Sequence, residues 1–263
     1  MTHVADWKGW FTRWEAQQSL YLPEREARFC IMIEILSALV GDAPTLIDLG
    51  CGPGSLALRI ADRLPDARVI AVDADPLLLE LGRRVVGDRG KRIRWVDADL
   101  RDSELARDLG VNRTADAALS TTALHWLSPQ ELAGLFKRLR HVLHPGGVFI
   151  NRDHLTFDHD QARIESAVNR LREKAAGDLR GPSVETWTKW WASIEAEPAL
   201  AELVAERRSR WGPHADHHSP REATSMRAAL QRAGFNEVST VWQWLDNGVL
   251  VAILGDSPLA RTS

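Results

Sequence analysis

The sequence has little cysteine and almost no tyrosine. Its 263 residues include two cysteines, Cys30 and Cys51, and a single tyrosine. Two widely spaced cysteines do not form a disulfide scaffold. They are typical of a protein that folds in a reducing compartment, so we expect a cytoplasmic location.

Long apolar runs and an excess of basic charge are also absent. No stretch has the uninterrupted apolar length of a transmembrane helix, and charged residues interrupt positions 1–14, where a signal peptide would have its apolar segment. The chain carries 33 basic and 36 acidic side chains, a formal net charge of −3. Proteins that neutralise many phosphates usually have a basic surface. We therefore expect no membrane contact, and the sequence argues against a nucleic-acid partner.

Tryptophan, in contrast, is abundant, with 11 residues. A buried tryptophan fills core volume, whereas a group of them can also line an aromatic substrate cavity. Trp7, Trp10, Phe11 and Trp14 recur at helical spacing and form one apolar face. This face is expected to cover the core of its own chain. The alternative is contact with a second subunit, so we predict a monomer or a homodimer.

Apolar runs of strand length alternate with helical segments in the first part of the chain. The expected strands are 45–49, 68–73, 93–96, 115–119 and 148–150, and the expected helices between them are 55–64, 76–86 and 129–143. Such alternation is typical of a mostly parallel sheet with helical crossovers.

The remaining chain divides into three further units. Two helices are expected in 1–43, before the α/β unit of 44–152. Residues 153–220 show helical periodicity without a convincing strand. Residues 221–256 comprise a helix over 221–233 and a hairpin of strands 238–244 and 249–254, with its turn at Asp246-Asn247-Gly248, because Asn-Gly between strand-like runs favours a tight turn.

The segment Asp48-Leu49-Gly50-Cys51-Gly52-Pro53-Gly54 lies between an expected strand and an expected helix. Glycine permits backbone conformations and close approaches that a Cβ atom forbids, and the amides at a helix start favour electron-rich ligand groups. The glycine spacing differs from that of the dinucleotide fingerprint. The Gly-Lys-Ser/Thr ending of a P-loop is absent.

This segment resembles the glycine-rich first motif of class I S-adenosylmethionine-dependent methyltransferases. The resemblance continues in order through Asp73, Asp99-Leu100 and Leu143-His144-Pro145-Gly146-Gly147; it covers residues 40–152 well and 221–254 more loosely. It implies an α/β, Rossmann-like, seven-stranded mixed sheet whose last strand is antiparallel and inserted beside its neighbour. N-terminal helices and a helical cap insertion after strand five would complete the fold, and S-adenosyl-L-methionine would be the cofactor.

The resemblance also implies roles for individual residues. Asp73 would bind the ribose hydroxyls, Asp99 and the Leu100 amide would contact adenine (with Asp97 as a weaker candidate), and Tyr21 and Arg28 would close over the methionine end. The full set of expected cofactor-binding residues is Asp48, Gly50, Cys51, Gly52, Gly54, Asp73, Ala74, Asp99, Leu100, Ser120, Tyr21 and Arg28.

Some of these residues also have a structural alternative. Gly50, Gly52 and Gly54 would then form a tight turn with no ligand. Asp73 would then be the N-cap of the next helix, and Asp48 would orient the loop without touching a ligand. Tyr21 and Arg28 would be ordinary residues of a helix surface.

Candidate catalytic residues follow strands four and five, because ligands bind at the carboxyl ends of parallel strands. They are His125, Asp153 and His154. Histidine titrates near neutral pH and can act as a base, although His125 could equally pack beside the cofactor. The segment His214-Ala215-Asp216-His217-His218 contains metal-ligand residue types, but adjacent ligands on a loop are a weak signal, so we predict no metal.

A helical cap rich in tryptophan would suit a flat or apolar ligand. The favoured function is therefore methyl transfer to an oxygen or nitrogen atom of a small, aromatic or apolar molecule. Ser120-Thr121-Thr122-Ala123 stands where amino-methylating nucleic-acid enzymes have Asn/Asp-Pro-Pro-aromatic, which disfavours that class. The alternatives are an RNA- or tRNA-modifying enzyme that uses S-adenosylmethionine and a non-catalytic protein that binds it.

Overall fold

The computed structural model describes residues 5–21, 24–41, 43–154, 161–179, 184–211 and 223–255. Its centre is a seven-stranded sheet in the order β3-β2-β1-β4-β5-β7-β6. The strands are β1 (Thr45–Leu49), β2 (Arg68–Asp73), β3 (Ile93–Asp97), β4 (Ala115–Thr121), β5 (Leu143–His154), β6 (Phe235–Trp244) and β7 (Asn247–Leu254).

Five of the strands are parallel, and β7 is antiparallel to both of its neighbours, β5 and β6. The predicted mixed sheet with an inserted antiparallel strand is therefore confirmed. The strand order reverses between β1 and β4, since the chain runs outward to β3 and then returns. Open α/β sheets bind ligands at this switch point, beyond the carboxyl ends of the strands.

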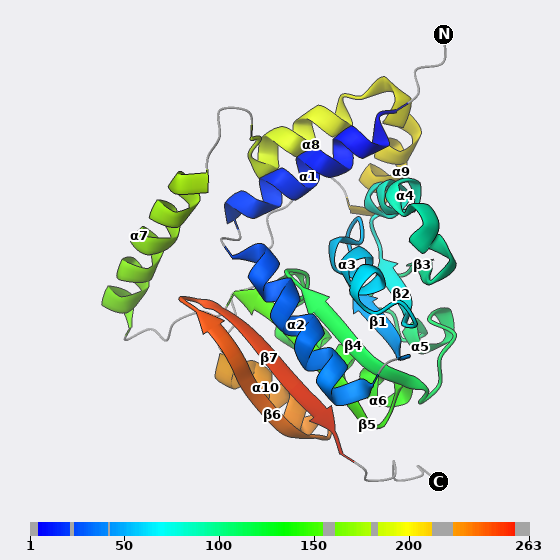
Figure 1. Cartoon of the computed structure of the whole chain (residues 1–263), viewed down its shortest axis with the longest axis vertical. Coiled ribbons are helices and arrows are strands. Elements are labelled where there is room, and N and C mark those ends of the chain that lie inside the picture. Colours follow the sequence, from blue (N-terminus) through cyan, green and yellow to red (C-terminus); the bar gives the residue numbers. More distant parts are fainter. Residues whose placement is uncertain are drawn as a thin grey trace.

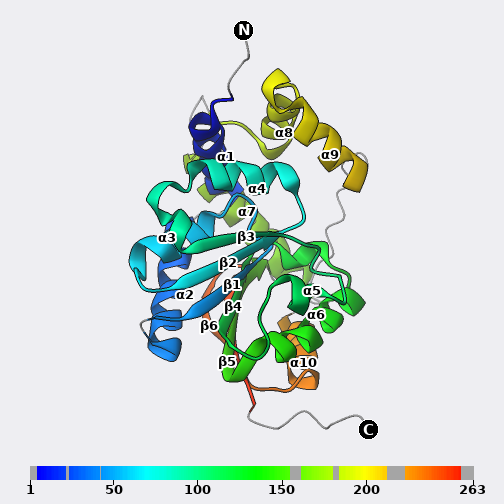
Figure 2. The same cartoon turned by 90° about the vertical axis from the view of Figure 1, so that its right-hand side faces the viewer.

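Helices cover both faces of the sheet (Figure 2). Those of one face include α2 (Arg25–Val40) and α3 (Ser55–Arg63), and those of the other include α5 (Leu105–Asp108), α6 (Pro129–Val142) and α10 (Ala223–Arg232). The parallel strands are apolar on both sides, as strands buried on two faces require: Leu46 faces the core beside α2 and α3, and Ile47 faces the core beside α6.

A second, smaller core joins the N-terminal helix to the segment after β5. Here α1 (Trp7–Tyr21) packs beside α8 (Trp187–Glu195), and α4 (Pro76–Val85) packs against α1 and α9 (Ala201–Trp211) (Figure 1). Tryptophan rings fill the space between α1 and α8, with centroid distances of 4.9–6.4 Å. The rings are those of Trp10, Trp14, Trp187, Trp190 and Trp191. These tryptophans therefore pack a core rather than line a substrate cavity.

Two predicted boundaries were wrong. Strand β5 begins at Leu143 and ends at His154, so Asp153 and His154 close the strand instead of following it. Its pairing with β4 jumps from Leu143 to Val148, because the Pro145-Gly146-Gly147 turn bulges out of the ladder. The hairpin turn also lies earlier than expected.

The turn between β6 and β7 consists of Leu245 and Asp246, and Asn247 is already the first residue of β7. Leu245 takes the left-handed conformation, with φ 52°, that the Asn-Gly pair was expected to supply. The side chain of Asn247 is instead buried at the strand end.

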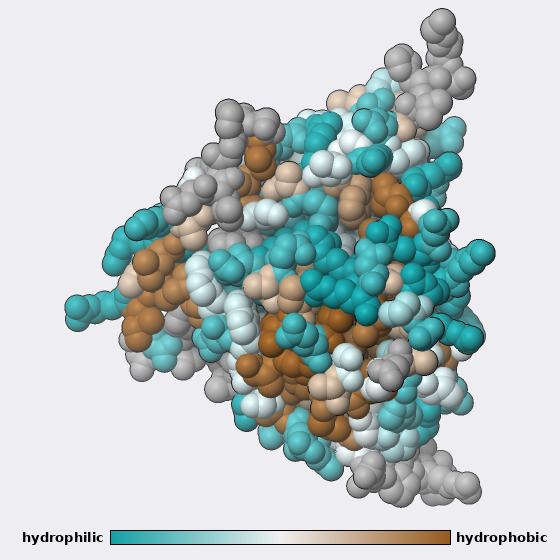
Figure 3. Space-filling view, viewed as in Figure 1, coloured by the Kyte–Doolittle hydropathy of each residue, from teal (hydrophilic) through white to brown (hydrophobic). Residues whose placement is uncertain are grey.

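Exposed apolar side chains gather over α2 and on α7 (Ala162–Leu179), where Figure 3 shows brown surface. They include Leu39 of α2 and Ile164 and Leu171 of α7. Among the helices that the structure describes, none combines the length and the apolar character needed to cross a membrane.

Candidate active site

The glycine loop leaves the carboxyl end of β1 and leads into α3. Gly50, Gly52 and Gly54 all have positive φ angles, of 67°, 53° and 81°. A Cβ atom on Gly50 would lie 2.4 Å from the Cβ atom of Ala123, which belongs to the loop after β4. The same atom on Gly52 would lie 3.7 Å from the ring of Trp14 and 3.9 Å from Leu78, which are ordinary contact distances. The loop is thus pressed against its neighbours at Gly50 and less tightly packed at Gly52.

Asp73 holds this loop in place from the end of β2. Its carboxylate accepts hydrogen bonds from the Gly52 amide at 2.7 Å and from the Asp75 amide at 2.9 Å. Asp75, not Asp73, caps α4, so the helix-cap interpretation of Asp73 was wrong. The half-buried carboxylate of Asp73 retains acceptor positions. It therefore fits the expected contact with two ribose hydroxyls.

Burial and the charge of Asp75 raise the pKa of Asp73 to about 6. Asp48 lies deeper, beneath the loop, and its carboxylate accepts a hydrogen bond from the Ala57 amide at 3.2 Å. Burial raises the pKa of Asp48 to about 7. Asp48 therefore ties β1 to the first turn of α3, which agrees with a role in orienting the loop.

Two more expected cofactor residues lie inside the protein. Ser120 is buried and donates its hydroxyl hydrogen to the carbonyl oxygen of Leu49, at 2.9 Å, so it links β4 to β1. Cys51 is buried too, and burial together with the charges of Asp73 and Asp48 raises the pKa of its thiol. Both side chains support the loop from below.

Helix α9 covers the ends of β2 and β3, where adenine is expected. Arg210 of α9 donates to the Asp97 carboxylate at 2.6 Å and to the Ala74 carbonyl at 3.1 Å. Asp99, the favoured adenine contact, is paired with Arg101. The segment after β5 was expected to cover the acceptor, but its last described helix lies over the cofactor half of the sheet.

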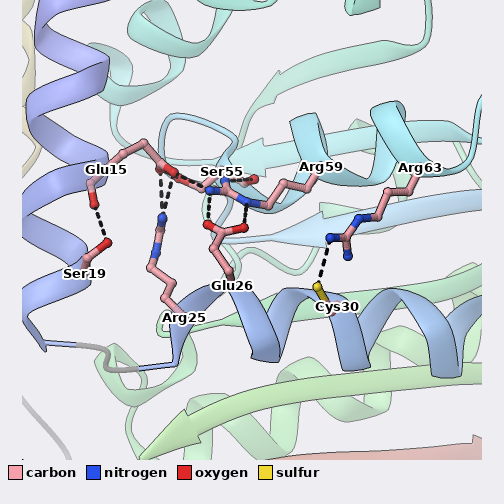
Figure 4. A network of polar contacts seen from close by, with 8 residues as sticks. All are labelled: Glu15, Ser19, Arg25, Glu26, Cys30, Ser55, Arg59 and Arg63. Carbon is pink, nitrogen blue, oxygen red and sulfur yellow. Dashed lines mark hydrogen bonds and ion pairs between the residues drawn. The ribbon is translucent and has the colours of Figure 1, made fainter. Parts of the chain in front are cut away.

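The N-terminal helices are fastened to the helix that follows the glycine loop by a network of charges (Figure 4). The Glu15 carboxylate of α1 accepts hydrogen bonds from Arg25 of α2 and from Ser55 and Arg59 of α3. Burial alone would raise the pKa of Glu15, but these donors and the two arginine charges lower it to about 2. Glu26 completes the network by pairing with Arg59.

Of the two residues expected at the methionine end, the side chain of Tyr21 lies outside the described part of the structure. Arg28 is only 2% exposed, so its interpretation as a helix-surface residue was wrong. Its guanidinium carbon lies 5.7 Å from the ring centroid of Trp242 and 6.0 Å from that of Trp244. Arg28 therefore faces the hairpin strands on the β5 side of the sheet.

The candidate catalytic residues form two separate pairs. His125 Nδ1 lies 2.9 Å from the Asp153 carboxylate, and His154 Nδ1 lies 3.2 Å from Asp246. Burial raises the pKa of Asp153, but the charge and hydrogen bond of His125 outweigh it, so the net shift is downward. Burial lowers the pKa of His154. The structure therefore joins His125 with Asp153 and places His154 with a partner that was not predicted.

Sequence reasoning missed the residues around that second pair. Arg152 is 1% exposed and donates a hydrogen bond to the side-chain oxygen of Asn247. Asp246 also accepts a hydrogen bond from Arg172 of α7, at 2.5 Å. The available signal was an arginine two residues after the apolar run Val148-Phe149-Ile150, since a charged residue in a buried strand requires partners.

Within the described ranges, no three histidine, cysteine, aspartate or glutamate residues are grouped so that they could hold a metal ion. The segment His214-Ala215-Asp216-His217-His218 lies outside those ranges.

Comparison with known proteins gives the same assignment as the fold. A family model described as a methyltransferase domain matches residues 46–147. The trans-aconitate 2-methyltransferase of Methylobacterium radiotolerans is 36% identical over 199 residues, covering 75% of this chain and 62% of that protein. The corresponding protein of Streptomyces coelicolor is 31% identical over 173 residues, covering 64% of this chain and 54% of its own length.

A solved structure with a similar fold is human N-acetylserotonin methyltransferase in complex with S-adenosylmethionine. Its TM-score is 0.55 at 18% identity, with 95% of this chain and 57% of that chain covered. The chain spans 54–62% of the length of the two curated relatives described above. With the glycine loop, Asp73 and the strand order in the places that this family requires, the chain belongs to the class I S-adenosylmethionine-dependent methyltransferases.

Proposed function

We propose that the protein transfers a methyl group from S-adenosylmethionine to an oxygen or nitrogen atom of a small molecule. One observation carries the proposal: the Asp73 carboxylate is bonded to the amide of Gly52, in the middle of a loop of left-handed glycines. This arrangement fixes an acceptor for the ribose hydroxyls directly beside the loop. A loop that served only as a turn would not need a carboxylate in this position.

The cofactor supplies, when bound, a methyl group on a positively charged sulfur, and this carbon bonds to the acceptor as its bond to sulfur breaks with the electron pair left on sulfur. The task of the chain is to bind, orient and exclude water. We assign the ribose to Asp73 and adenine to the region of Asp99 and Leu100. The positive φ angles of Gly50, Gly52 and Gly54 would shape the loop that holds the methionine part, and Asp48, Cys51 and Ser120 would support the loop.

We place the acceptor at the carboxyl ends of β4 and β5, where His125 and Asp153 form their hydrogen-bonded pair. The trans-aconitate 2-methyltransferases among the relatives support a small-molecule acceptor. Asp153 is hydrogen-bonded to Nδ1 of His125 and so orients the ring at this position. His125 would act as a base only if the acceptor carries a proton on the methylated atom.

The test is methyl transfer from radiolabelled S-adenosylmethionine to pools of small organic acids, phenols and amines, with total RNA as a separate acceptor. We expect product with at least one small-molecule pool, and a loss of about 100-fold or more in Asp73→Ala. Labelling of RNA alone would contradict the small-molecule proposal. A protein that binds the cofactor but methylates nothing would favour the non-catalytic alternative.

We further propose a cytoplasmic protein that is a monomer or a homodimer. The negative formal charge supports the absence of a nucleic-acid partner. Light scattering of the purified chain distinguishes the two assembly states.

A further inference from the structure

Two arginines are buried on the same side of the sheet, next to the proposed acceptor position. Arg152 of β5 is paired with Val249 of β7, which is paired with Trp242 of β6. Side chains that are directly opposite one another on paired strands point to the same face. Helix α2 packs against β5 and brings Arg28 over this row, near Trp242.

The next row follows the same face toward the strand ends. His154 is paired with Asn247, which is paired with Trp244. Both His154 and Trp244 are only partly buried. They therefore mark the side from which a ligand reaches Arg152, at the carboxyl end of β5 where ligands of α/β sheets bind.

The guanidinium of Arg152 has unused hydrogen-bonding capacity. Its Nη2 atom donates to Asn247, but Nε and Nη1 have no hydrogen-bond partner among the residues that the structure describes. Buried donors without partners cost free energy, and a buried charge without an adequate counter-charge costs more. A planar fork of donors is the geometry that binds carboxylates and phosphates with two hydrogen bonds.

The nearby acidic groups offset the charge of Arg152 only in part. Asp153 Oδ1 is bonded to His125, while its Oδ2 atom has no hydrogen-bond partner among the described residues, and Asp246 is bonded to His154 and to Arg172. Burial and the charge of Arg28 lower the pKa of Arg152, while Asp153 and Asp246 oppose this shift without cancelling it. Burial also lowers the pKa of Arg28, to about 10, against the opposing charges of Asp246 and Glu24. Burial thus disfavours the charge on Arg152 more than the neighbouring acids favour it.

We infer that Arg152, together with Arg28, binds an anionic group of the methyl acceptor, so that the substrate class is an organic acid. This inference rests on the proposed function, since it assigns the acceptor of that same site. A carboxylate and a phosphate share the required chemistry, and Trp242 and Trp244 supply flat apolar surfaces for the carbon part of the molecule. Arg152 is then a binding residue that sets substrate specificity.

A purely structural role for Arg152 predicts a different response to mutation. If Arg152 serves the fold, Arg152→Met lowers the melting temperature. If it serves a ligand, the variant folds as well as the wild type or better, because an apolar side chain replaces a poorly compensated buried charge. Stability and binding therefore separate the two roles.

The experiment is calorimetric titration of the protein saturated with S-adenosylhomocysteine. The probes are tricarballylate, succinate and inorganic phosphate, and the variants are Arg152→Met, Arg152→Lys and Arg92→Met. Arg92 is a partly buried arginine that bonds to backbone carbonyls of residues 61 and 64, near the opposite ends of the strands, and so controls for the loss of any arginine.

We expect at least one probe to bind the wild type and Arg92→Met equally. Arg152→Met should weaken that binding by about 10- to 100-fold, the range of a charge-assisted hydrogen-bonded contact, with a smaller loss in Arg152→Lys, which keeps the charge but not the fork. S-Adenosylhomocysteine affinity and the melting temperature of Arg152→Met should not fall. Phosphate binding that depends on Arg152 would support the anion site and identify a phosphorylated acceptor.

Three results would overturn the inference. They are binding of no probe by a wild type that binds S-adenosylhomocysteine, probe binding that Arg152→Met leaves unchanged, and a parallel loss of melting temperature, cofactor affinity and probe affinity in that variant. A wild type that fails to bind S-adenosylhomocysteine would instead refute the proposed function.

Discussion

The carboxyl groups of Asp48 and Asp73 hold the glycine loop, and burial raises the pKa of both. An acid whose pKa is higher in the folded than in the unfolded state holds its proton more tightly when folded. Its contribution to stability is then lost as the pH rises from the unfolded to the folded pKa. For Asp48 this window runs from the ordinary aspartate pKa of 3.8 to a pKa of about 7, and for Asp73 it ends at about 6.

We therefore predict that the cofactor-free protein loses stability between about pH 5 and 7. Asp48 should account for about 2 kcal/mol of this loss. Asp48→Asn keeps an acceptor for the Ala57 amide and cannot ionise, so that part of the pH dependence should disappear. Urea denaturation of the wild type and Asp48→Asn at both pH values measures the free energy of unfolding. The difference between the pH dependences of the two proteins removes the contributions of other groups such as His154. Identical pH slopes would contradict the assignment.

The glycine loop offers a second test on single residues. Gly50 and Gly146 both have positive φ angles, of 67° and 79°, but a Cβ atom meets Ala123 at 2.4 Å at Gly50 and nothing within 4 Å at Gly146. Gly146→Ala should cost about 1 kcal/mol, from the backbone conformation alone. Gly50→Ala should cost about 2 kcal/mol or more in addition and abolish binding of S-adenosylhomocysteine. Denaturation and calorimetry measure both effects, and equal costs would show that the contact with Ala123 relaxes freely.

Secondary-structure elements outside the common methyltransferase core are joined to it by ion pairs of different kinds. Asp75 caps α4 by accepting hydrogen bonds from Leu77 and Leu78, and it also receives Arg207 of α9 at 2.6 Å in a buried pair. The pair of Asp62 and Arg89, in contrast, is exposed. Whether an ion pair is buried or exposed decides how much the loss of one partner changes the free energy of unfolding.

Asp75→Ala should destabilise the protein by about 3 kcal/mol, because it removes a helix cap and leaves Arg207 buried with less counter-charge. Asp62→Ala should cost less than about 1 kcal/mol. The free energy of unfolding in urea decides between these values. Similar costs for the two variants would mean that α9 is not held to α4 in the way the structure shows.

Elements with clear periodicity could be predicted from the sequence nearly to the residue. The expected helix 76–86 is α4, Pro76–Val85, because Asp75 and Pro76 provide a strong start signal. The turn of the last hairpin could not be placed, since Leu245 accepts a positive φ that local preference assigns to Asn-Gly. At this turn, the pairing register of β7 with β5 and β6 outweighs the local conformational preference of Asn-Gly.

At the scale of the whole molecule, the sequence predicted the arrangement around the glycine loop and the ends of β2 and β3 better than the arrangement at the ends of β5 and β7. Asp73, Asp99 and the glycine loop lie next to strand ends, so the strand order alone brings them together. Arg152 and Asp246 meet only because β7 inserts between β5 and β6 and α2 covers their face. Contacts of this kind depend on long-range packing and leave no periodic signal in the sequence.

The positions of the helices after β5 were also not predicted in full. The insertion was expected to cover the acceptor. Its helix α7 reaches Asp246, the partner of His154, through Arg172. In contrast, α8 packs on α1 through tryptophans and α9 lies over the ends of β2 and β3. The large tryptophan content thus reflects how α1 and α8 are joined. The acceptor half instead has Trp242 and Trp244 beside two buried arginines.

We propose that Asp73 and the glycine loop bind the cofactor of a methyltransferase. Calorimetric titration of S-adenosylhomocysteine into the wild type and Asp73→Ala measures this binding. We predict one binding site per chain in the wild type and an affinity lower by about 30-fold or more in Asp73→Ala, because two hydrogen bonds to a carboxylate are lost. A folded wild type that binds no S-adenosylhomocysteine, or a variant that binds it equally well, would contradict the account.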